Sequence, residues 1–202
     1  MSAVNQAEGD TATRILDSAE RLVQTRGFNG FSYADIATEL GVTKASLHYH
    51  FASKAELGLA LIERYSERFE GALERIDEAG GEPPAKLAAY TRIFAEVLRD
   101  GRNCLCGMLA ADFETLSEPM RAAVVAFFDE NEEWLARVLA DGTADGSLQP
   151  EGSARETAQA LFGGLEGAML LARPYGRVDR FEDAAGRLLA SLAGSRAAQA
   201  TG

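Results

Sequence analysis

The only two histidines of the chain, His48 and His50, lie in the segment GVTKASLHYHFASKAEL at 41–57. The same segment holds two of the three lysines, Lys44 and Lys54, and no acidic residue before Glu56. Imidazole can act as a general base, and an enzyme using either histidine is one alternative. No serine or cysteine nucleophile lies beside a histidine–acid relay in the sequence, so we predict no catalytic residue. Cationic and hydroxyl groups without neighbouring carboxylates suit phosphate oxygens and base edges instead.

The polar residues of this segment fall into two groups by the contact that each can make with DNA. Lys44, Ala45 and Ser46 begin a short predicted helix and are the candidates for base contact, since lysine donates to guanine and an alanine methyl can touch thymine. The candidates for phosphate contact are Thr43, His48, Tyr49, His50 and Lys54. The alternative for any one of them is an ordinary packed or surface side chain. Their combination favours a DNA-binding surface.

The charge of the whole chain limits how such a surface can work. The net charge is -11, with 20 Lys and Arg against 31 Asp and Glu. Contacts with a polyanion act within about one Debye length, roughly 8–10 Å in physiological salt. We therefore expect the acidic remainder to weaken non-specific binding, so that the few local cations decide where the protein binds.

Short helices around this segment would position these side chains. FSYADIATELG predicts a helix that Ser32 caps and Gly41 ends, and Thr43 can cap the next helix, which runs to about His50. This is the pattern of a helix-turn-helix, whose second helix enters the major groove. Its predicted core is Ile36, Leu40, Val42 and Leu47, packed on Leu22 of a preceding helix. A long helix capped by Ser53 and Glu56 follows, up to the sequence EAGGEPP.

The rest of the chain also predicts helices, at about 85–100, 104–115, 118–141, 152–174 and 179–194. Alternating strand patterns are absent, so the predicted fold class is all-α. We predict a three-helix helix-turn-helix domain at 1–55 and a helical ligand-binding and dimerisation domain at 56–202. Residues 1–9 and 195–202 are predicted to be disordered ends.

The segment GFNGFSYADIATELGVTKASLHYHFASKAEL resembles the N-terminal DNA-binding domain of TetR/AcrR-type transcriptional regulators, over residues 13–60. That family typically has Leu-Tyr-Tyr/His-His/Tyr-Phe followed by Ser-Lys-x-x-Leu. Here the run is Leu47-His48-Tyr49-His50-Phe51, then Ser53-Lys54, so His48 stands where a phosphate-contacting tyrosine is usual. The resemblance implies a homodimeric repressor that releases a palindromic double-stranded DNA operator when a small molecule binds the C-terminal domain.

Polar residues that interrupt apolar stripes are the pointers to an effector site in that domain. Asp112 and Asn131 do so, and either could orient a ligand. The alternative for both is a salt bridge, a cap or a partly exposed edge. The candidate wall residues, which could equally be ordinary core, are Phe94, Met108, Phe113, Phe128 and Trp134.

Cys104 and Cys106, two residues apart, allow two interpretations. Free cysteines are commonly small buried apolar residues. The sharper hypothesis is a thiol switch for oxidants or electrophiles, with Cys104 near a helix N-terminus that could lower its pKa. A disulfide framework is implausible, and we predict no metal site, no cofactor and a cytoplasmic location.

The glycine-rich segment ALFGGLEGAMLLAR at 160–173 predicts a close helix contact. With 179–194 it suggests a helix pair that self-associates across a two-fold axis, and the alternative is internal close packing. A helical partner-binding module without DNA binding is the remaining alternative function. No apolar run approaches the roughly 18 residues of a membrane span, so no membrane partner is predicted.

Overall fold

The computed structural model describes residues 3–193, with side chains from residue 10 onward. Its helices are α1 (Ala3–Arg26), α2 (Tyr33–Leu40), α3 (Lys44–His50), α4 (Lys54–Glu78), α5 (Pro83–Arg99), α6 (Leu105–Ala111), α7 (Glu118–Asp145), α8 (Ala154–Ala172) and α9 (Val178–Ala190). Single-turn 3-10 helices lie at η1 (Phe28–Gly30), η2 (Phe113–Thr115) and η3 (Arg173–Tyr175). Over the described residues no strand forms, only an isolated bridge between Leu148 and Ala193. The all-α prediction is confirmed.

The chain forms two compact units. The first comprises the residues up to Glu67 together with Leu105–Val125, and the second comprises Arg68–Cys104 and the residues from Ala126 onward. The domain boundary at residues 55 and 56 stays a prediction. Of the predicted disordered ends, residues 1, 2 and 194–202 lie outside the described residues, whereas α1 includes residues 3–9. None of the helices described is long and apolar enough to cross a membrane.

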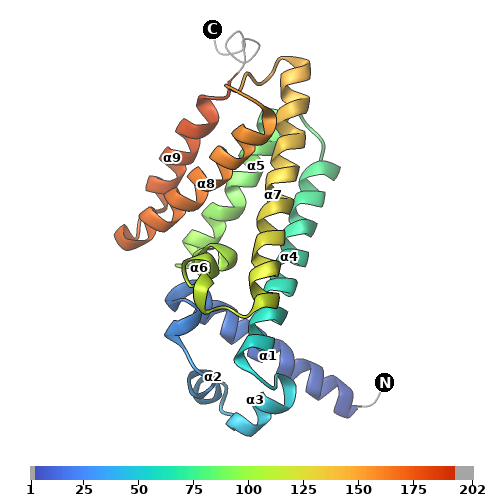
Figure 1. Ribbon diagram of the computed structural model, residues 1–202, viewed down its shortest axis with the longest axis vertical. Coiled ribbons are helices and arrows are strands. Elements are labelled where there is room, and N and C mark those ends of the chain that lie inside the picture. Colours follow the sequence, from blue (N-terminus) through green and yellow to red (C-terminus); the bar gives the residue numbers. More distant parts are fainter. Residues whose placement is uncertain (1–2, 194–202) are drawn as a thin grey trace. The chain divides into compact units, whose positions relative to one another are not determined.

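In the first unit the N-terminal helix carries the apolar stripe that its sequence predicts. Ile15, Ala19, Leu22 and Val23 are each at most 1% exposed. Helix α1 packs against α2, and α2 against α3 (Figure 1). Ile36 and Leu47 are fully buried, while Leu40 and Val42 lie at the edge of this core. Each buried aliphatic side chain contributes roughly 1.5–3 kcal/mol, so a few such residues hold these short helices together.

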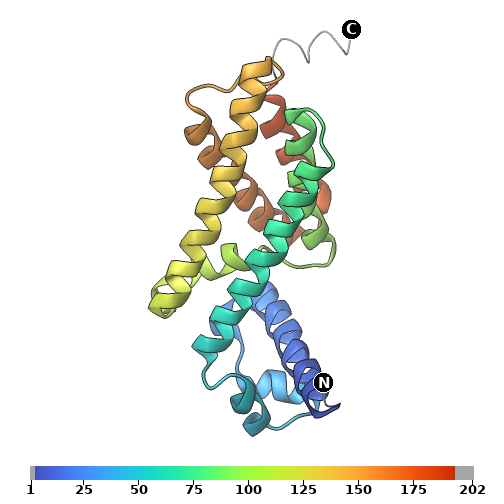
Figure 2. The same cartoon turned by 90° about the vertical axis from the view of Figure 1, so that its right-hand side faces the viewer.

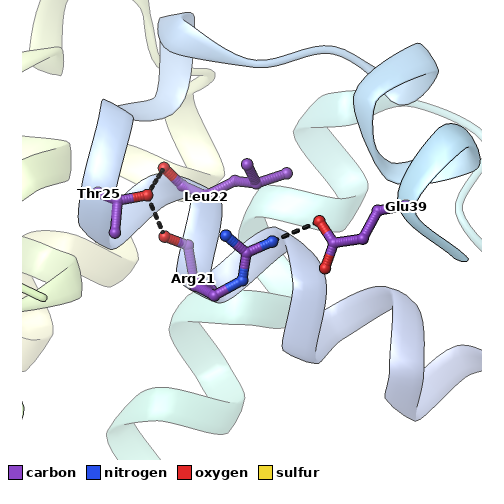
Figure 3. Close-up of polar contacts among 4 residues, drawn as sticks. All are labelled: Arg21, Leu22, Thr25 and Glu39. Carbon is purple, nitrogen blue, oxygen red and sulfur yellow. Dashed lines mark hydrogen bonds and ion pairs between the residues drawn. The ribbon is translucent and has the colours of Figure 1, made fainter. Parts of the chain in front are cut away.

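Ion pairs on the outside of the first unit join α1 to its neighbours. Arg21 pairs with Glu39 of α2, and Thr25 Oγ1 donates to the Arg21 carbonyl at 2.6 Å (Figure 3). Exposed pairs of this kind contribute little stability. Arg64 of α4 reaches Glu20 at 2.7 Å, and the Glu20 side chain is only 6% exposed. This more buried pair orients the first half of α4 on α1.

An aromatic cluster forms the core of the second unit. Helices α8 and α9 pack on each other and on α5 (Figures 1 and 2). Five helices contribute the rings, namely Phe69, Tyr90, Phe94, Phe127, Phe162 and Phe181. Neighbouring centroids lie between 5.2 Å (Phe69–Phe127) and 6.5 Å (Phe94–Phe162), mostly with edge-to-face geometry. Aromatic pairs at such separations favour one packed arrangement.

Two predicted helix boundaries differ from those observed. We expected 118–141, but α7 continues through Gly142 to Asp145. A Cβ at Gly142 would lie 2.5 Å from the Leu148 side chain. Glycine at this position therefore leaves space for Leu148 to pack on the helix and does not end the helix. The helix expected at 104–115 instead ends at Ala111 and resumes as η2.

Candidate functional site

Helix α3 presents the predicted DNA-contacting side chains on its outer side. Leu47 is fully buried and fixes the inner side of the helix. The exposed residues are Thr43, Lys44, Ala45, His48 and Tyr49, and Ser46 and His50 are partly exposed. Tyr49 is 73% exposed, which is unusual for so large a ring. The arrangement leaves this side of the helix open to a partner.

The turn before α3 fixes where the helix begins. Gly41 has φ 67°, a left-handed conformation that side chains with a Cβ resist. The Val42 N–H then donates to the Ala37 carbonyl at 3.0 Å, which closes α2. Thr43 Oγ1 accepts from the Ser46 N–H at 3.1 Å and caps α3. The predicted cap at Thr43 is confirmed, and Lys44 to Ser46 form the first turn.

The C-terminal end of α3 is held by side chains from both sides. Tyr33 donates its hydroxyl to the Phe51 carbonyl at 2.9 Å, and its ring lies 4.8 Å from that of His48. Burial, followed by the charge of Glu56, raises the pKa of Tyr33 to about 12, so this phenol stays a donor. His48 Nδ1 lies 3.1 Å from the Ala52 carbonyl, which can only accept. This bond therefore requires the proton on Nδ1.

Lys54 was predicted to contact phosphate, but its surroundings indicate a structural role as well. Its Nζ donates to the carbonyls of Phe28 at 2.6 Å and Phe31 at 2.5 Å. It also lies over both rings, 4.6 Å and 4.2 Å from their centroids. Burial lowers the pKa of Lys54, although Asp112 and Asp35 oppose that effect. Lys54 thus joins the start of α4 to the turn after α1, and phosphate contact by its remaining proton stays a prediction.

Asp112 lies in the first unit, at the break between α6 and η2. Its Oδ2 accepts from the Phe28 N–H at 2.8 Å and the Asn29 N–H at 3.3 Å, and its Oδ1 accepts from Asn29 Nδ2 at 3.1 Å. The carboxylate therefore caps η1, which matches the cap alternative given above. A role for Asp112 in ligand binding stays a prediction that must compete with these bonds.

Asn131 and Trp134 lie in the core of the second unit with their polar atoms bonded. Tyr90 donates its hydroxyl to Asn131 Oδ1 at 2.8 Å, and Asn131 Nδ2 donates to the Phe127 carbonyl at 2.8 Å. Trp134 Nε1 donates to Asp77 at 2.9 Å, and its ring stacks on Tyr90 at 5.5 Å. Both residues have the contacts of structural core. Their ligand roles stay predictions.

The remaining wall candidates divide between the two units. Phe94 is 2% exposed in the second unit, while Phe128 is partly exposed and lies 5.6 Å from Phe162. On α7 the more deeply buried ring is Phe127, at 1% exposed, and the sequence analysis named its neighbour Phe128 instead. Met108 and Phe113 are partly exposed in the first unit. The structure therefore does not bring the seven predicted ligand residues together within one unit.

A buried acid on α8 is the polar group that the sequence analysis missed. Glu166 Oε1 is buried and has no hydrogen-bond partner among the described residues, although other parts of the side chain reach solvent. The Cys104 thiol is hydrogen-bonded to this carboxyl. Burial raises the pKa of Glu166 to about 7, and the bond from Cys104 opposes that rise. The available signal was an acid within the apolar sequence LFGGLEGAMLL.

Both cysteines are buried, Cys104 at 1% and Cys106 at 0% exposed. The Cys104 N–H donates to Met169 Sδ at 3.3 Å, which joins Cys104 to α8 within the second unit. Reactive thiols are usually partly exposed. The geometry favours small buried core residues over the thiol switch.

Comparison with known proteins agrees with this architecture. Residues 15–61 match the family model "Bacterial regulatory proteins, tetR family", and 83–188 match "Tetracyclin repressor-like, C-terminal domain". Transcriptional regulator AcuR of Cereibacter sphaeroides is 31% identical over 152 residues, covering 73% of this chain and 69% of that protein. HTH-type transcriptional repressor NemR of Escherichia coli is 28% identical, covering 82% of this chain and 85% of that one.

The solved structures give the same result. A TetR-family transcriptional regulator from Agrobacterium tumefaciens has a TM-score of 0.89 and 32% identity, covering 93% of this chain and all of that one. The chain therefore belongs to the tetR family of bacterial regulatory proteins, and it is a ligand-responsive DNA-binding regulator of transcription rather than an enzyme.

Proposed function

We propose that this regulator is a repressor that reads a palindromic operator through α3 and acts in the cytoplasm. The observation that carries the proposal is the outer side of α3. Its residues are exposed or partly exposed and include no acid, and the helix that bears them begins at the Thr43 cap. Lys44, Ala45 and Ser46 would contact base edges. The phosphate contacts would come from Thr43, His48, Tyr49 and His50, with Lys54 reduced to one remaining proton.

The operator would be read by a homodimer. Two copies of α3 about 34 Å apart, one turn of DNA, would enter successive major grooves. Leu170 and Leu171 of α8 are 56% and 66% exposed, and Tyr175 after it is 62% exposed. Apolar exposure of this extent on one helix marks a surface that a partner covers. These residues support the predicted dimer through about 152–174 and 179–194.

Release of the operator would follow from effector binding in the second unit. A ligand can shift the protein away from its DNA-binding conformation only by binding the other conformation more tightly. Four of the seven predicted ligand residues belong to this unit, namely Phe94, Phe128, Asn131 and Trp134. We therefore place the effector there.

The test is a mobility shift with DNA from upstream of the gene, repeated at several salt concentrations. Specific binding should weaken steeply as salt rises. Lys44→Ala should weaken operator binding by about 5- to 100-fold, the effect of losing one base contact, and should affect unrelated DNA less.

Arg92→Ala is the matched control, because it also removes one exposed cation but lies on α5. It should leave operator affinity within about twofold of the parent, since Arg92 is not among the predicted DNA contacts and an exposed charge without a specific contact has a small effect. Specific binding that Lys44→Ala leaves intact would contradict the assigned reading surface. The absence of any specific fragment would contradict the proposed function itself.

A further inference from the structure

The buried carboxyl of Glu166 stands out in the core of the second unit. A buried acceptor usually has a hydrogen-bond partner, and each exception calls for an explanation. Glu166 Oε1 has none among the described residues. Only the Cys104 thiol, a weak donor, is hydrogen-bonded to the group. Oε1 of this carboxyl is thus removed from water without a hydrogen bond that compensates for it.

No cation among the described side chains of residues 10–193 offsets this charge. Two effects act on the pKa of Glu166, burial and the Cys104 hydrogen bond, and no charged side chain is among them. Of the neighbouring polar groups, Tyr90 and Asn131 are already bonded to each other at 2.8 Å. An ionised carboxylate in such a place is costly unless a counter-charge arrives. None of the lysine and arginine side chains in the described part of the chain supplies one.

Aromatic side chains lie near the same position on α8. Phe162 lies one turn before Glu166 on α8, so both side chains project from one face of that helix. Phe162 lies 5.6 Å from Phe128 and 6.5 Å from Phe94. The negative charge of Glu166 also acts on Tyr90, whose pKa lies well above its ordinary value chiefly because of burial. A carboxylate near aromatic side chains is a suitable environment for an organic cation.

We propose that Glu166 anchors the effector, and that the effector is an organic cation carrying an ammonium group next to an apolar or aromatic portion. The ammonium would donate to Glu166 Oε1 and supply the missing counter-charge. The apolar portion would lie against Phe162 and its ring neighbours Phe94 and Phe128. This inference rests on the proposed function and adds the chemical class of the ligand.

The test uses the full-length protein with three probes, phenethylamine, 3-phenylpropylamine and 4-phenylbutylamine. Each probe is paired with the alcohol that replaces its ammonium by a hydroxyl. Binding is followed at pH 8 by calorimetry and by the fluorescence of Trp134, the single tryptophan. At least one amine should bind tenfold or more tightly than its alcohol. Glu166→Gln should remove at least tenfold of that amine's affinity and leave the alcohol's unchanged.

Glu133→Gln is the matched control, because it removes one negative charge from an exposed position on α7 of the same unit. It should change amine affinity by less than twofold, which excludes general attraction to an acidic protein. Glu166→Met, apolar and of similar length, replaces the glutamine variant if that variant does not fold. The absence of an amine preference in all three pairs, or a preference that survives both Glu166 variants, would overturn the proposal. Operator binding measured on the same preparations separates failure of the anchor from failure of the proposed function.

Discussion

Single charged side chains in this protein have roles that depend on what surrounds them. Lys44 and Lys54 lie in one cationic segment, yet the first is exposed and the second is held by two carbonyls and two rings. His48 carries its proton on Nδ1, so a phosphate at Nε2 would require the doubly protonated ring. The tyrosine usual at this position donates without that requirement. The type of a residue therefore predicts which contacts its side chain can make, and the neighbouring residues decide which of those contacts it makes.

Lys54→Ala should lower the free energy of unfolding by about 1–3 kcal/mol, because it leaves the Phe28 and Phe31 carbonyls without this donor. Lys44→Ala should change stability by less than about 0.5 kcal/mol, since its side chain is exposed. Urea unfolding of both variants measures the difference. Equal stabilities would mean that Lys54 is not a structural link.

Glu166 should make stability depend on pH. Its pKa is about 7 in the folded protein against an ordinary 4.5, so the folded state holds the proton more tightly than the unfolded chain. The contribution of Glu166 to stability is then most favourable below about pH 4.5 and falls as pH rises toward 7. At about 1.4 kcal/mol per pH unit the loss approaches about 3 kcal/mol, and solvent access to part of the side chain reduces it.

Glu166→Gln removes this titration. The variant should therefore gain stability over the parent at pH 8 and gain less at pH 5, as measured by urea unfolding at both values. A difference that stays constant with pH would show that the Glu166 carboxyl is not titrating in this range.

At the scale of elements, local sequence signals predicted the helix-turn-helix well. The Ser32 and Thr43 caps, the Gly41 turn and the burial of Leu47 all follow from residues within one or two turns. What the sequence could not provide were the partners of Asp112 and Lys54, because these lie 84 and up to 26 residues away in the chain. Neighbouring rings on α7 also could not be assigned to a face, so Phe127 was missed. The signal for Glu166 was one acid among apolar residues, which does not distinguish an exposed acid from a buried one.

Gly41→Ala should destabilise the turn between α2 and α3 by about 1–2 kcal/mol. No atom lies within 4 Å of an added Cβ, so the cost comes from the left-handed φ of 67° alone. Gly41→Asn is the informative control, because asparagine tolerates this conformation better and should cost less. Thermal unfolding ranks the three proteins, and operator affinity should fall in the same order. An alanine variant as stable as the parent would contradict the conformational explanation.

At the scale of the whole molecule, charge and assembly act together. A chain of net charge -11 repels DNA, so a few cations on one α3 give weak binding. Two α3 helices held in one particle bind with a high effective concentration at the second half-site. The acidic background and the proposed dimer would therefore have complementary effects, because the first suppresses binding at single sites and the second would restore it at paired sites.

Leu171→Glu should disrupt the proposed dimer. Leu171 is 66% exposed on α8, so the change should leave the folded monomer intact. In the dimer it would bury an unpaired carboxylate, which is strongly unfavourable. Light scattering at micromolar concentration should give roughly twice 21.6 kDa for the parent and one such mass for the variant.

Val125→Glu, at a 45% exposed apolar residue of α7, is the control and should keep the parent's mass. Loss of the dimer should reduce affinity for a palindromic operator far more than for a single half-site. A parent that is itself monomeric, or a variant that stays dimeric, would move the interface away from α8.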